Sequence, residues 1–383
     1  MYQVSSVDPD QQVRKLQFLD GLRGLAAVYV VIGHGRALFW EGYTDGFLTH
    51  PDSYSAFEKW QMYFFSLFKF GHEAVLFFFV LSGFVIHLKY ASNYSRTGLY
   101  QFQYGSYLVK RIKRIYPPFI FALLLTAMLD ALGVYYNLPI YSGLTIYTNI
   151  NQNHGHLFHD FGTLVGNLFF LYKVYCPIFG SNGPAWSLKF EWWFYMLYPA
   201  LLLLAQRRIM VSTAVVSVLF VLAILPFEWP ENLLQDVCTM LLSWWFGVLL
   251  AEVHCGRFKI PVRKLSWLML SVVVLPVTSE WQESVYWTNV AIFFTGMLAF
   301  LLSSAEKWYT RLLSRLKPLG DFSYTLYIVH YPILTFLSGW LMYTSDGILP
   351  AHSMFILPAV LLPIILSYFI HFLTEVPFVR RKP

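Results

Sequence analysis

The hydrophobic positions of the 383-residue chain form long runs separated by short polar stretches. A helix rises about 1.5 Å per residue, so roughly 20 apolar residues are needed to cross about 30 Å of membrane hydrocarbon. The segment 161–175 is apolar but too short, and it predicts a helix that lies at the outer interface or re-enters the protein. Ten longer runs predict an all-α integral membrane protein with about ten transmembrane helices, near residues 19–39, 72–90, 115–136, 184–205, 209–226, 236–253, 264–278, 286–303, 322–341 and 352–373.

Composition agrees with a chain that is solvated largely by lipid. Hydrophobic residues make up 57% of the sequence and charged residues only 13%, which is too few to build a soluble surface. Aromatic residues reach 19%, and the many Trp and Tyr side chains suit the two membrane interfaces. The three cysteines are scattered and odd in number, so they suggest neither a disulfide framework nor a zinc site.

The distribution of basic residues predicts the topology, because cytoplasmic loops carry an excess of Lys and Arg. We predict a cytoplasmic N-terminal tail over 1–17, a single transmembrane domain over 18–377 and a basic cytoplasmic tail over 378–383. The net charge of +6 then reflects topology and not nucleic-acid binding. This orientation places 21 of the 27 basic residues on the cytoplasmic side: Arg14, Lys15, Lys89, Arg96, Lys110, Arg111, Lys113, Arg114, Arg207, Arg208, Arg257, Lys259, Arg263, Lys264, Lys307, Arg311, Arg315, Lys317, Arg380, Arg381 and Lys382.

The first hydrophobic run contains two polar residues that a purely structural span has little reason to keep, Arg23 and His34. At 100° per residue they lie on one face of a helix, separated by roughly 16 Å along its axis. Arg23 falls near the cytoplasmic end and His34 lies deeper. Two structural explanations stay open: Arg23 extends to the inner headgroups, and His34 is a hydrogen-bonded interior residue.

Several motifs in this order resemble the acyltransferase 3 family of membrane-bound O-acyltransferases. The resemblance covers the chain from residue 18 to about 377, and the order of the blocks is more specific than any single block. The blocks are Leu19-Asp20-Gly21-Leu22-Arg23-Gly24-Leu25-Ala26-Ala27 with His34, Phe77-Phe78-Phe79-Val80-Leu81-Ser82-Gly83-Phe84, Arg111-Ile112-Lys113-Arg114-Ile115-Tyr116-Pro117, Pro184-Ala185-Trp186-Ser187-Leu188 with Glu191 and Tyr195, and Gly320-Asp321-Phe322-Ser323-Tyr324 with Tyr327, His330 and Pro332.

The resemblance implies transfer of an acyl group, commonly acetyl, from cytoplasmic acyl-coenzyme A to a hydroxyl group. The acceptor would be a cell-envelope glycan such as O-antigen, capsule or peptidoglycan, and the location a bacterial inner membrane. Acetyl-coenzyme A or another acyl-coenzyme A would be a co-substrate, with no tightly bound cofactor and no metal. A transporter of a glycan or lipid intermediate, and an enzyme that acylates a small-molecule metabolite, remain as alternatives.

Such a reaction assigns roles to the polar residues of the spans. A histidine with a near-neutral pKa can take the proton of the attacking alcohol, and we expect His34 to act as this base. Arg23 would orient the coenzyme or its thioester. Arginine forks bind phosphate oxygens well, so Arg111 and Arg114 are expected to hold the coenzyme phosphates. Their alternative role is as topology signals that face anionic lipid.

The remaining candidates lie at the predicted outer ends and interiors of other spans. Glu191 is expected to orient His34 or bind acceptor hydroxyls, unless it pairs with Lys189 or Lys173. His330 precedes Pro332, which frees backbone groups to line a cavity, and its role as site or structure stays open. The other expected substrate-binding residues are Trp186, Tyr195, Tyr324 and Glu73.

We do not predict a serine nucleophile or a histidine metal site, although residues of both types are present. Ser82 precedes a glycine in mid-span, where a serine is more often a helix-packing or helix-bonding residue than a nucleophile. The loop histidines His154, His156 and His159 lack a carboxylate or cysteine at ligand spacing. We expect them to form a solvated loop cluster and not a metal site.

Overall fold

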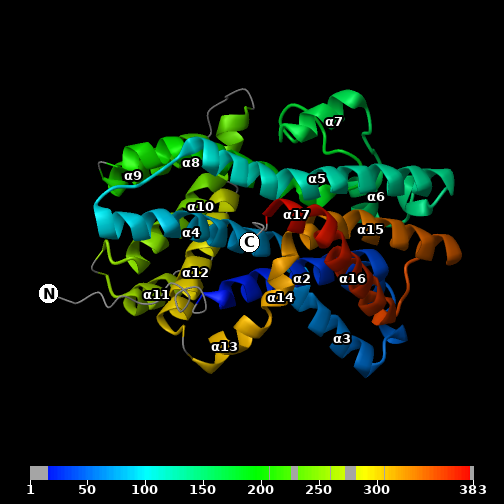
Figure 1. The fold of residues 1–383 in the computed structure, drawn as a ribbon. Coiled ribbons are helices and arrows are strands. Elements are labelled where there is room, and N and C mark those ends of the chain that lie inside the picture. Colours follow the sequence, from blue (N-terminus) through cyan, green and yellow to red (C-terminus); the bar gives the residue numbers. More distant parts are fainter. Residues whose placement is uncertain are drawn as a thin grey trace. The chain divides into compact units, whose positions relative to one another are not determined.

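The computed structural model describes residues 16–206, 208–225, 232–258, 260–271, 282–305 and 307–379 (Figure 1). Within these ranges all regular elements are helices, and two isolated bridges join Phe158 to Phe179 and Tyr172 to Cys176. The predicted all-α class is therefore confirmed. Parts of the predicted basic pattern lie outside the described residues, namely Arg14, Lys15, Arg207, Lys259 and Arg380 to Lys382.

The described helices are long and apolar enough for a membrane protein that crosses the bilayer several times. The predicted runs near 184–205 and 209–226 form α8 (Trp186–Ala205) and the shorter α9 (Ile209–Ile224). The run near 264–278 begins as α11 (Val262–Ser271) and continues beyond the described residues. Seven segments of the described chain could span a membrane by length and composition: Gln17–Phe47, Ala56–Thr97, Tyr104–Tyr135, Leu233–His254, Glu283–Ser303, Ser323–Thr344 and Ser353–Val379.

Each of the ten predicted runs thus overlaps a helix, and in the described part of the chain seven segments meet the length and hydropathy expected of a span. The count of ten and the orientation stay predictions. The short apolar segment 161–175 contains the eight-residue helix α7 (Phe161–Leu168), whose N-terminus is capped by the Asp160 side chain. A helix that the hydrophobic runs do not predict, α3 (Ala56–Ser66), begins with a capping box between Ser55 and Glu58.

The chain divides into two compact units, which we describe separately. Unit 1 consists of Met1–Ala26, Val75–Gln103 and Phe194–Asp321, and unit 2 of Ala27–Ala74, Tyr104–Trp193 and Phe322–Pro383. The elements α2 (Gln17–Phe39), α4 (Gly71–Thr97) and α8 each contribute residues to both units.

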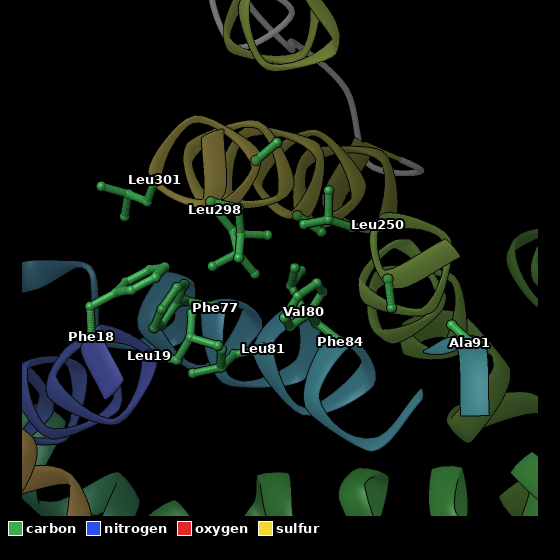
Figure 2. Close-up of a cluster of buried hydrophobic side chains, with 14 residues drawn as sticks. Phe18, Leu19, Phe77, Val80, Leu81, Phe84, Ala91, Leu250, Leu298 and Leu301 are labelled. Atoms are coloured by element: carbon green, nitrogen blue, oxygen red, sulfur yellow. The ribbon is translucent and has the colours of Figure 1, made fainter. Parts of the chain in front are cut away.

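Unit 1 is built around a hydrophobic core between α4, α10 (Leu233–His254) and α12 (Gln282–Ser303). In Figure 2, Phe77, Val80 and Phe84 of α4 face Leu250 of α10 and Leu298 of α12. Phe18 and Leu19 of α2 complete the core, and both are buried. Two short helices, α13 (Trp308–Arg315) and α14 (Lys317–Asp321), follow α12 along the chain.

Within this core, α4 and α10 touch through their backbones at two glycines. A Cβ atom on Gly83 would lie 2.1 Å from the carbonyl oxygen of Trp244, and one on Gly247 would lie 1.9 Å from that of Val80. Both distances are impossible for a real side chain, so only glycine permits this approach. Small residues play the same part in many membrane helix pairs.

Unit 2 is organised around α15 (Ser323–Thr344), which is buried over most of its length and packs against α5 (Tyr104–Tyr135) and α16 (Ile356–Thr374). The Tyr324 hydroxyl donates to the Ile115 carbonyl of α5 at 3.1 Å. The shorter elements of this unit are η1 (Gly42–Phe47), η2 (Pro51–Ser53), η3 (Leu67–Lys69), η4 (Pro139–Tyr141), α6 (Thr148–His154), η5 (Gly183–Ala185), η7 (Ser353–Phe355) and α17 (Val376–Val379).

Candidate active site

A cluster of aromatic and imidazole rings in unit 2 contains two of the residues that the sequence singles out. His34, on α2, lies beside His330 of α15, with 5.3 Å between the ring centroids and 35° between the ring planes. The edge of the neighbouring Tyr331 ring meets His34 at a centroid distance of 4.8 Å. His330 and Tyr331 are both buried, whereas His34 is half-buried. The structure therefore brings together two predicted site residues that lie about 300 positions apart.

The hydrogen bond of His330 determines which of its nitrogens carries a proton. Its Nδ1 atom lies 3.1 Å from the Leu326 carbonyl oxygen, one turn earlier in α15. A carbonyl can only accept, so Nδ1 must donate. In the neutral ring this leaves Nε2 as an acceptor, and that atom is buried without a hydrogen-bond partner among the described residues. His330 thus holds a lone pair that is available to a hydroxyl donor.

Tyr331 also contacts a third histidine, His154 of α6. The two rings stack at 5.6 Å, and the Tyr331 hydroxyl lies 3.2 Å from His154 Nε2. Burial lowers the pKa of His154 to about 4, so this side chain is neutral near pH 7. The prediction of a solvated loop cluster is wrong for His154, because tertiary packing against Tyr331 buries it. His156 and His159 are exposed as expected.

A buried carboxylate supports the loop beside this ring cluster. Asp130 of α5 accepts hydrogen bonds from the backbone N–H and the hydroxyl of Ser181, at 2.8 and 2.6 Å. His159 Nε2 lies 2.9 Å from the same carboxylate. Asp130 is completely buried, and these contacts anchor the segment that leads into the Pro184-Ala185-Trp186-Ser187 block.

This block reaches α15 through a set of short contacts. The Ser187 and Tyr327 hydroxyls lie 2.7 Å apart, and the Tyr327 hydroxyl also donates to the Pro184 carbonyl at 3.1 Å. The Asn182 amide nitrogen donates to the Ile328 carbonyl at 2.8 Å. Two of the sequence blocks, distant along the chain, therefore pack directly against each other in unit 2.

The predicted acceptor-side residues occupy the surroundings of this contact. The Trp186 ring lies 5.4 Å from the ring of His72, and the Lys173 ammonium lies 6.0 Å above Trp186. Glu191, half-buried on α8, interacts electrostatically with Tyr327. Glu73 lies in the first turn of α4 and interacts electrostatically with Tyr29 of α2.

Arg23 lies in unit 1, although it shares helix α2 with His34. Its Nη2 atom donates to the Gly320 carbonyl at 2.8 Å and lies 3.1 Å from the Asp20 carboxylate. A Cβ atom on Gly24 would lie 2.7 Å from the Gly320 backbone nitrogen, so the glycines of this block let α2 and α14 meet closely. Arg23 therefore joins these two helices, and its side chain is 22% exposed.

The two arginines expected to bind phosphate lie on α5 in unit 2. The Arg111 guanidinium lies 5.4 Å from the Tyr107 ring centroid, within cation–π range. Arg114 interacts electrostatically with Glu375. The Glu375 carboxylate accepts hydrogen bonds from the Thr325 N–H and hydroxyl at 3.1 and 2.5 Å, which holds it against the start of α15.

Tyr195, another predicted site residue, belongs to unit 1. Its hydroxyl is 3.1 Å from Ser82 Oγ, which also accepts from Trp244 Nε1 at 3.3 Å. These contacts join α8, α4 and α10. They agree with the expectation that Ser82 forms bonds between helices.

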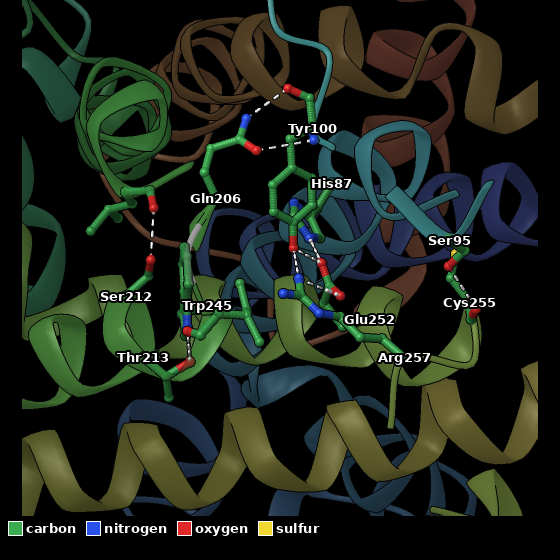
Figure 3. Close-up of polar contacts among 12 residues, drawn as sticks. His87, Ser95, Tyr100, Gln206, Ser212, Thr213, Trp245, Glu252, Cys255 and Arg257 are labelled. Carbon is green, nitrogen blue, oxygen red and sulfur yellow. Dashed lines mark hydrogen bonds and ion pairs between the residues drawn. The ribbon is translucent and has the colours of Figure 1, made fainter. Parts of the chain in front are cut away.

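Unit 1 contains a second buried polar cluster, which the sequence analysis did not identify (Figure 3). His87 Nε2 lies 2.5 Å from Glu252 Oε1, and its Nδ1 lies 2.7 Å from the Tyr198 hydroxyl. Tyr100 donates to the same Glu252 oxygen at 2.5 Å, and Arg257 contacts both Tyr100 and Glu252 Oε2. The Glu252 charge is thus compensated by an arginine and several hydrogen-bond donors, as a buried carboxylate requires.

Three buried residues that were not predicted as site or cluster residues could have been recognised from the sequence. Asp130, His87 and Glu252 are ionisable groups inside predicted spans, and the rule that drew attention to Arg23 applies equally to them. Asn182 and Tyr331 carry no charge and gave no such signal. The described residues contain no group of three or more His, Cys, Asp or Glu side chains that could hold a metal ion.

Comparison with known proteins identifies the family. The sequence profile described as an acyltransferase domain, of the acyltransferase 3 type, matches residues 16–372. No curated protein and no solved structure shows significant similarity to the chain. The profile covers all the blocks described above, including the ring cluster and its supporting loop. The chain therefore belongs to the acyltransferase 3 family and is a membrane acyltransferase.

Proposed function

We propose that the enzyme transfers an acetyl group from cytoplasmic acetyl-coenzyme A to a hydroxyl of a cell-envelope glycan such as O-antigen, capsule or peptidoglycan. The observation that carries the proposal is the contact between His34 and His330 beside Tyr331. Two imidazoles in a largely buried site provide a base for the alcohol and an acceptor that positions it.

In this proposal His34 removes the proton of the attacking hydroxyl. The hydroxyl oxygen forms a bond to the thioester carbonyl carbon, and the carbon–sulfur bond of the donor breaks when the tetrahedral intermediate collapses. The proton held by His34 then passes to the leaving sulfur, which releases free coenzyme A. His330 Nε2 accepts a hydrogen bond from the acceptor and helps to orient it.

The donor side is assigned to the arginines. Arg111 and Arg114 would bind the coenzyme phosphates through their guanidinium forks, and Arg23 would orient the coenzyme or its thioester. The basic residues at the start of α5, which include Arg111 and Arg114, support the proposal that this end of the helix faces the cytoplasm. Ten spans with cytoplasmic termini in a bacterial inner membrane would complete this arrangement.

Trp186, Glu191, Glu73, Tyr195 and Tyr324 are proposed to line the path of the acceptor or donor. Glu191 is the strongest of these, because it lies near Tyr327, which contacts the block before α8. We assign it to acceptor binding or to the orientation of His34. A small-molecule acceptor would use the same residues.

Transfer of label from radiolabelled acetyl-coenzyme A by the purified protein tests this function. We expect label in extracted envelope glycan, no transfer by His34→Ala, and normal transfer by His156→Ala, which changes an exposed histidine. Incorporation into a small metabolite and not into glycan would move the acceptor to that class. A folded wild-type protein that consumes no acetyl-coenzyme A with any acceptor would contradict the proposal.

A further inference from the structure

Asn182 lies at the end of the loop that Asp130 anchors, and a backbone hydrogen bond across it defines its conformation. The N–H of Gly183 donates to the Ser181 carbonyl at 2.8 Å, and Asn182 itself has φ −80° and ψ 61°. These values describe an inverse γ-turn with Asn182 at its centre. The side chain is 2% exposed. Asn182 therefore presents its amide in one defined direction.

The Ile328 carbonyl is free to bond to Asn182 because a proline removes the donor that the helix would otherwise supply. In an α-helix the Ile328 carbonyl would accept from the N–H of residue 332, but Pro332 has none. The Asn182 amide nitrogen supplies the missing hydrogen bond at 2.8 Å. This contact ties the loop to the stretch of α15 that carries His330 and Tyr331.

The same contact shows which atom of the Asn182 side-chain amide points away from Ile328. The Ile328 carbonyl can only accept, so the group that faces it is the nitrogen, and the oxygen must be the other atom. Asn182 Oδ1 is buried and has no hydrogen-bond partner among the described residues. A buried acceptor without a donor is costly, and a substrate that supplies a hydrogen would relieve that cost.

The position of Asn182 links it to the ring cluster. A Cβ atom on the adjacent Gly183 would lie 3.8 Å from Cε1 of Tyr331, and His34 meets the same Tyr331 ring. Gly183 and His34 thus approach one aromatic ring from two elements of unit 2, and Asn182, the residue before Gly183, is bonded to Ile328, two residues before His330. Tyr331 is therefore the shared neighbour from which we argue that an acceptor bound at His34 extends toward Asn182.

We propose that Asn182 Oδ1 accepts a hydrogen bond from a second hydroxyl of the acceptor, next to the one that is acylated. This inference rests on the proposed function, because it assumes that His34 receives the reacting hydroxyl. It specifies the substrate class as a polyhydroxylated acceptor, such as a sugar, and not a molecule with a single hydroxyl.

Two simple alcohols that differ by one hydroxyl test the proposal, trans-cyclohexane-1,2-diol and cyclohexanol. One neutral hydrogen bond corresponds to a preference of about three- to tenfold in kcat/KM for the diol in the wild type. Asn182→Ala should lose this preference and also lower the melting temperature, since it leaves the Ile328 carbonyl without a donor. Acetyl-coenzyme A is the donor in every assay.

A second substitution separates substrate binding from helix capping. Pro332→Ala provides the backbone N–H that Ile328 lacks, so the double variant Asn182→Ala/Pro332→Ala should regain the melting temperature but not the diol preference. Pro363→Ala, the same change in α16, should restore neither in the Asn182→Ala background. If the double variant regained both properties, Asn182 would be a capping residue only and the proposal would be overturned.

Failure of the proposed function would give a different experimental result from failure of the Asn182 proposal. If the wild type consumed no acetyl-coenzyme A with envelope glycan or with either alcohol, the proposed function would fall, and the melting temperature with each alcohol would still report on Asn182. A larger stabilisation of the wild type by the diol than of the double variant supports the binding role. Equal stabilisation of the two proteins contradicts it.

Discussion

His34 and His330 come from helices at opposite ends of the sequence, and their rings lie 5.3 Å apart in unit 2. The Leu326 carbonyl fixes the proton of His330 on Nδ1, which leaves Nε2 as an acceptor. No equivalent backbone bond holds the ring of His34 among the contacts of the described residues. One imidazole is therefore fixed in orientation, while the other is freer to take up and return a proton.

We predict that His34→Ala abolishes transfer and leaves donor binding largely intact. General base catalysis contributes roughly 10²- to 10⁴-fold, so the rate should fall by at least that range. Initial rates with labelled acetyl-coenzyme A measure the first effect, and calorimetric titration of the donor measures the second. Comparable rates for the variant and the folded wild type would remove His34 from the role of base.

His330→Gln should lower kcat/KM for the acceptor by about tenfold or more, because the substituted amide cannot reproduce the fixed imidazole acceptor. KM for the donor should change little. Thr335→Val, on the same helix, removes a buried hydroxyl that has no hydrogen-bond partner in the described part of the chain, and it is the matched control. An unchanged acceptor KM and kcat in the His330 variant would show that this residue is structural.

Arg111→Ala should raise the KM for acyl-coenzyme A and reduce the dependence of donor binding on salt. A contact with a phosphate is partly screened as ionic strength rises, and its loss removes that dependence. Lys110→Ala, a neighbouring change on α5, is the control and should keep the wild-type salt dependence. Equal slopes for wild type and the Arg111 variant would assign Arg111 to topology or lipid contact.

The buried cluster of unit 1 should be a major source of stability. Removal of one partner of a buried ion pair costs about 3–5 kcal/mol, so His87→Ala or Glu252→Gln should lower the melting temperature strongly. Glu283→Gln, at an exposed position of α12, should change stability by less than about 0.5 kcal/mol. If both cluster variants changed the melting temperature only slightly, the contacts around Glu252 would not be a major source of stability.

His154 should make unit 2 sensitive to acid. Burial lowers its pKa from 6.5 to about 4, so the unfolded chain binds this proton before the folded chain as pH falls. The stabilisation by neutral His154 is complete above about pH 6.5 and about 3 kcal/mol is lost by about pH 4. Between these pH values the melting temperature should depend less on pH for His154→Gln than for wild type. His156→Gln should show the same pH dependence as wild type.

The sequence predicted most helices because the thickness of a membrane imposes a minimum length on apolar runs. It missed α3, although the Ser55 and Glu58 capping box is a readable start signal, since the helix is short and mixed in polarity. The meeting of His34 with His330 could be expected only through the family resemblance. The burial of His154 and the direction of Asn182 depend on packing between distant segments, which a single sequence does not encode in its local pattern.

The paired glycines of α4 and α10 impose a mechanical condition on unit 1. With Gly83 against the Trp244 carbonyl and Gly247 against the Val80 carbonyl, neither helix can turn about its axis without driving a neighbouring residue's Cβ into a backbone oxygen. The two helices are therefore restrained against rotation relative to each other, and we expect them to move as one body during turnover. We expect any conformational change that admits a donor or releases a product to occur at helix contacts other than the one between α4 and α10.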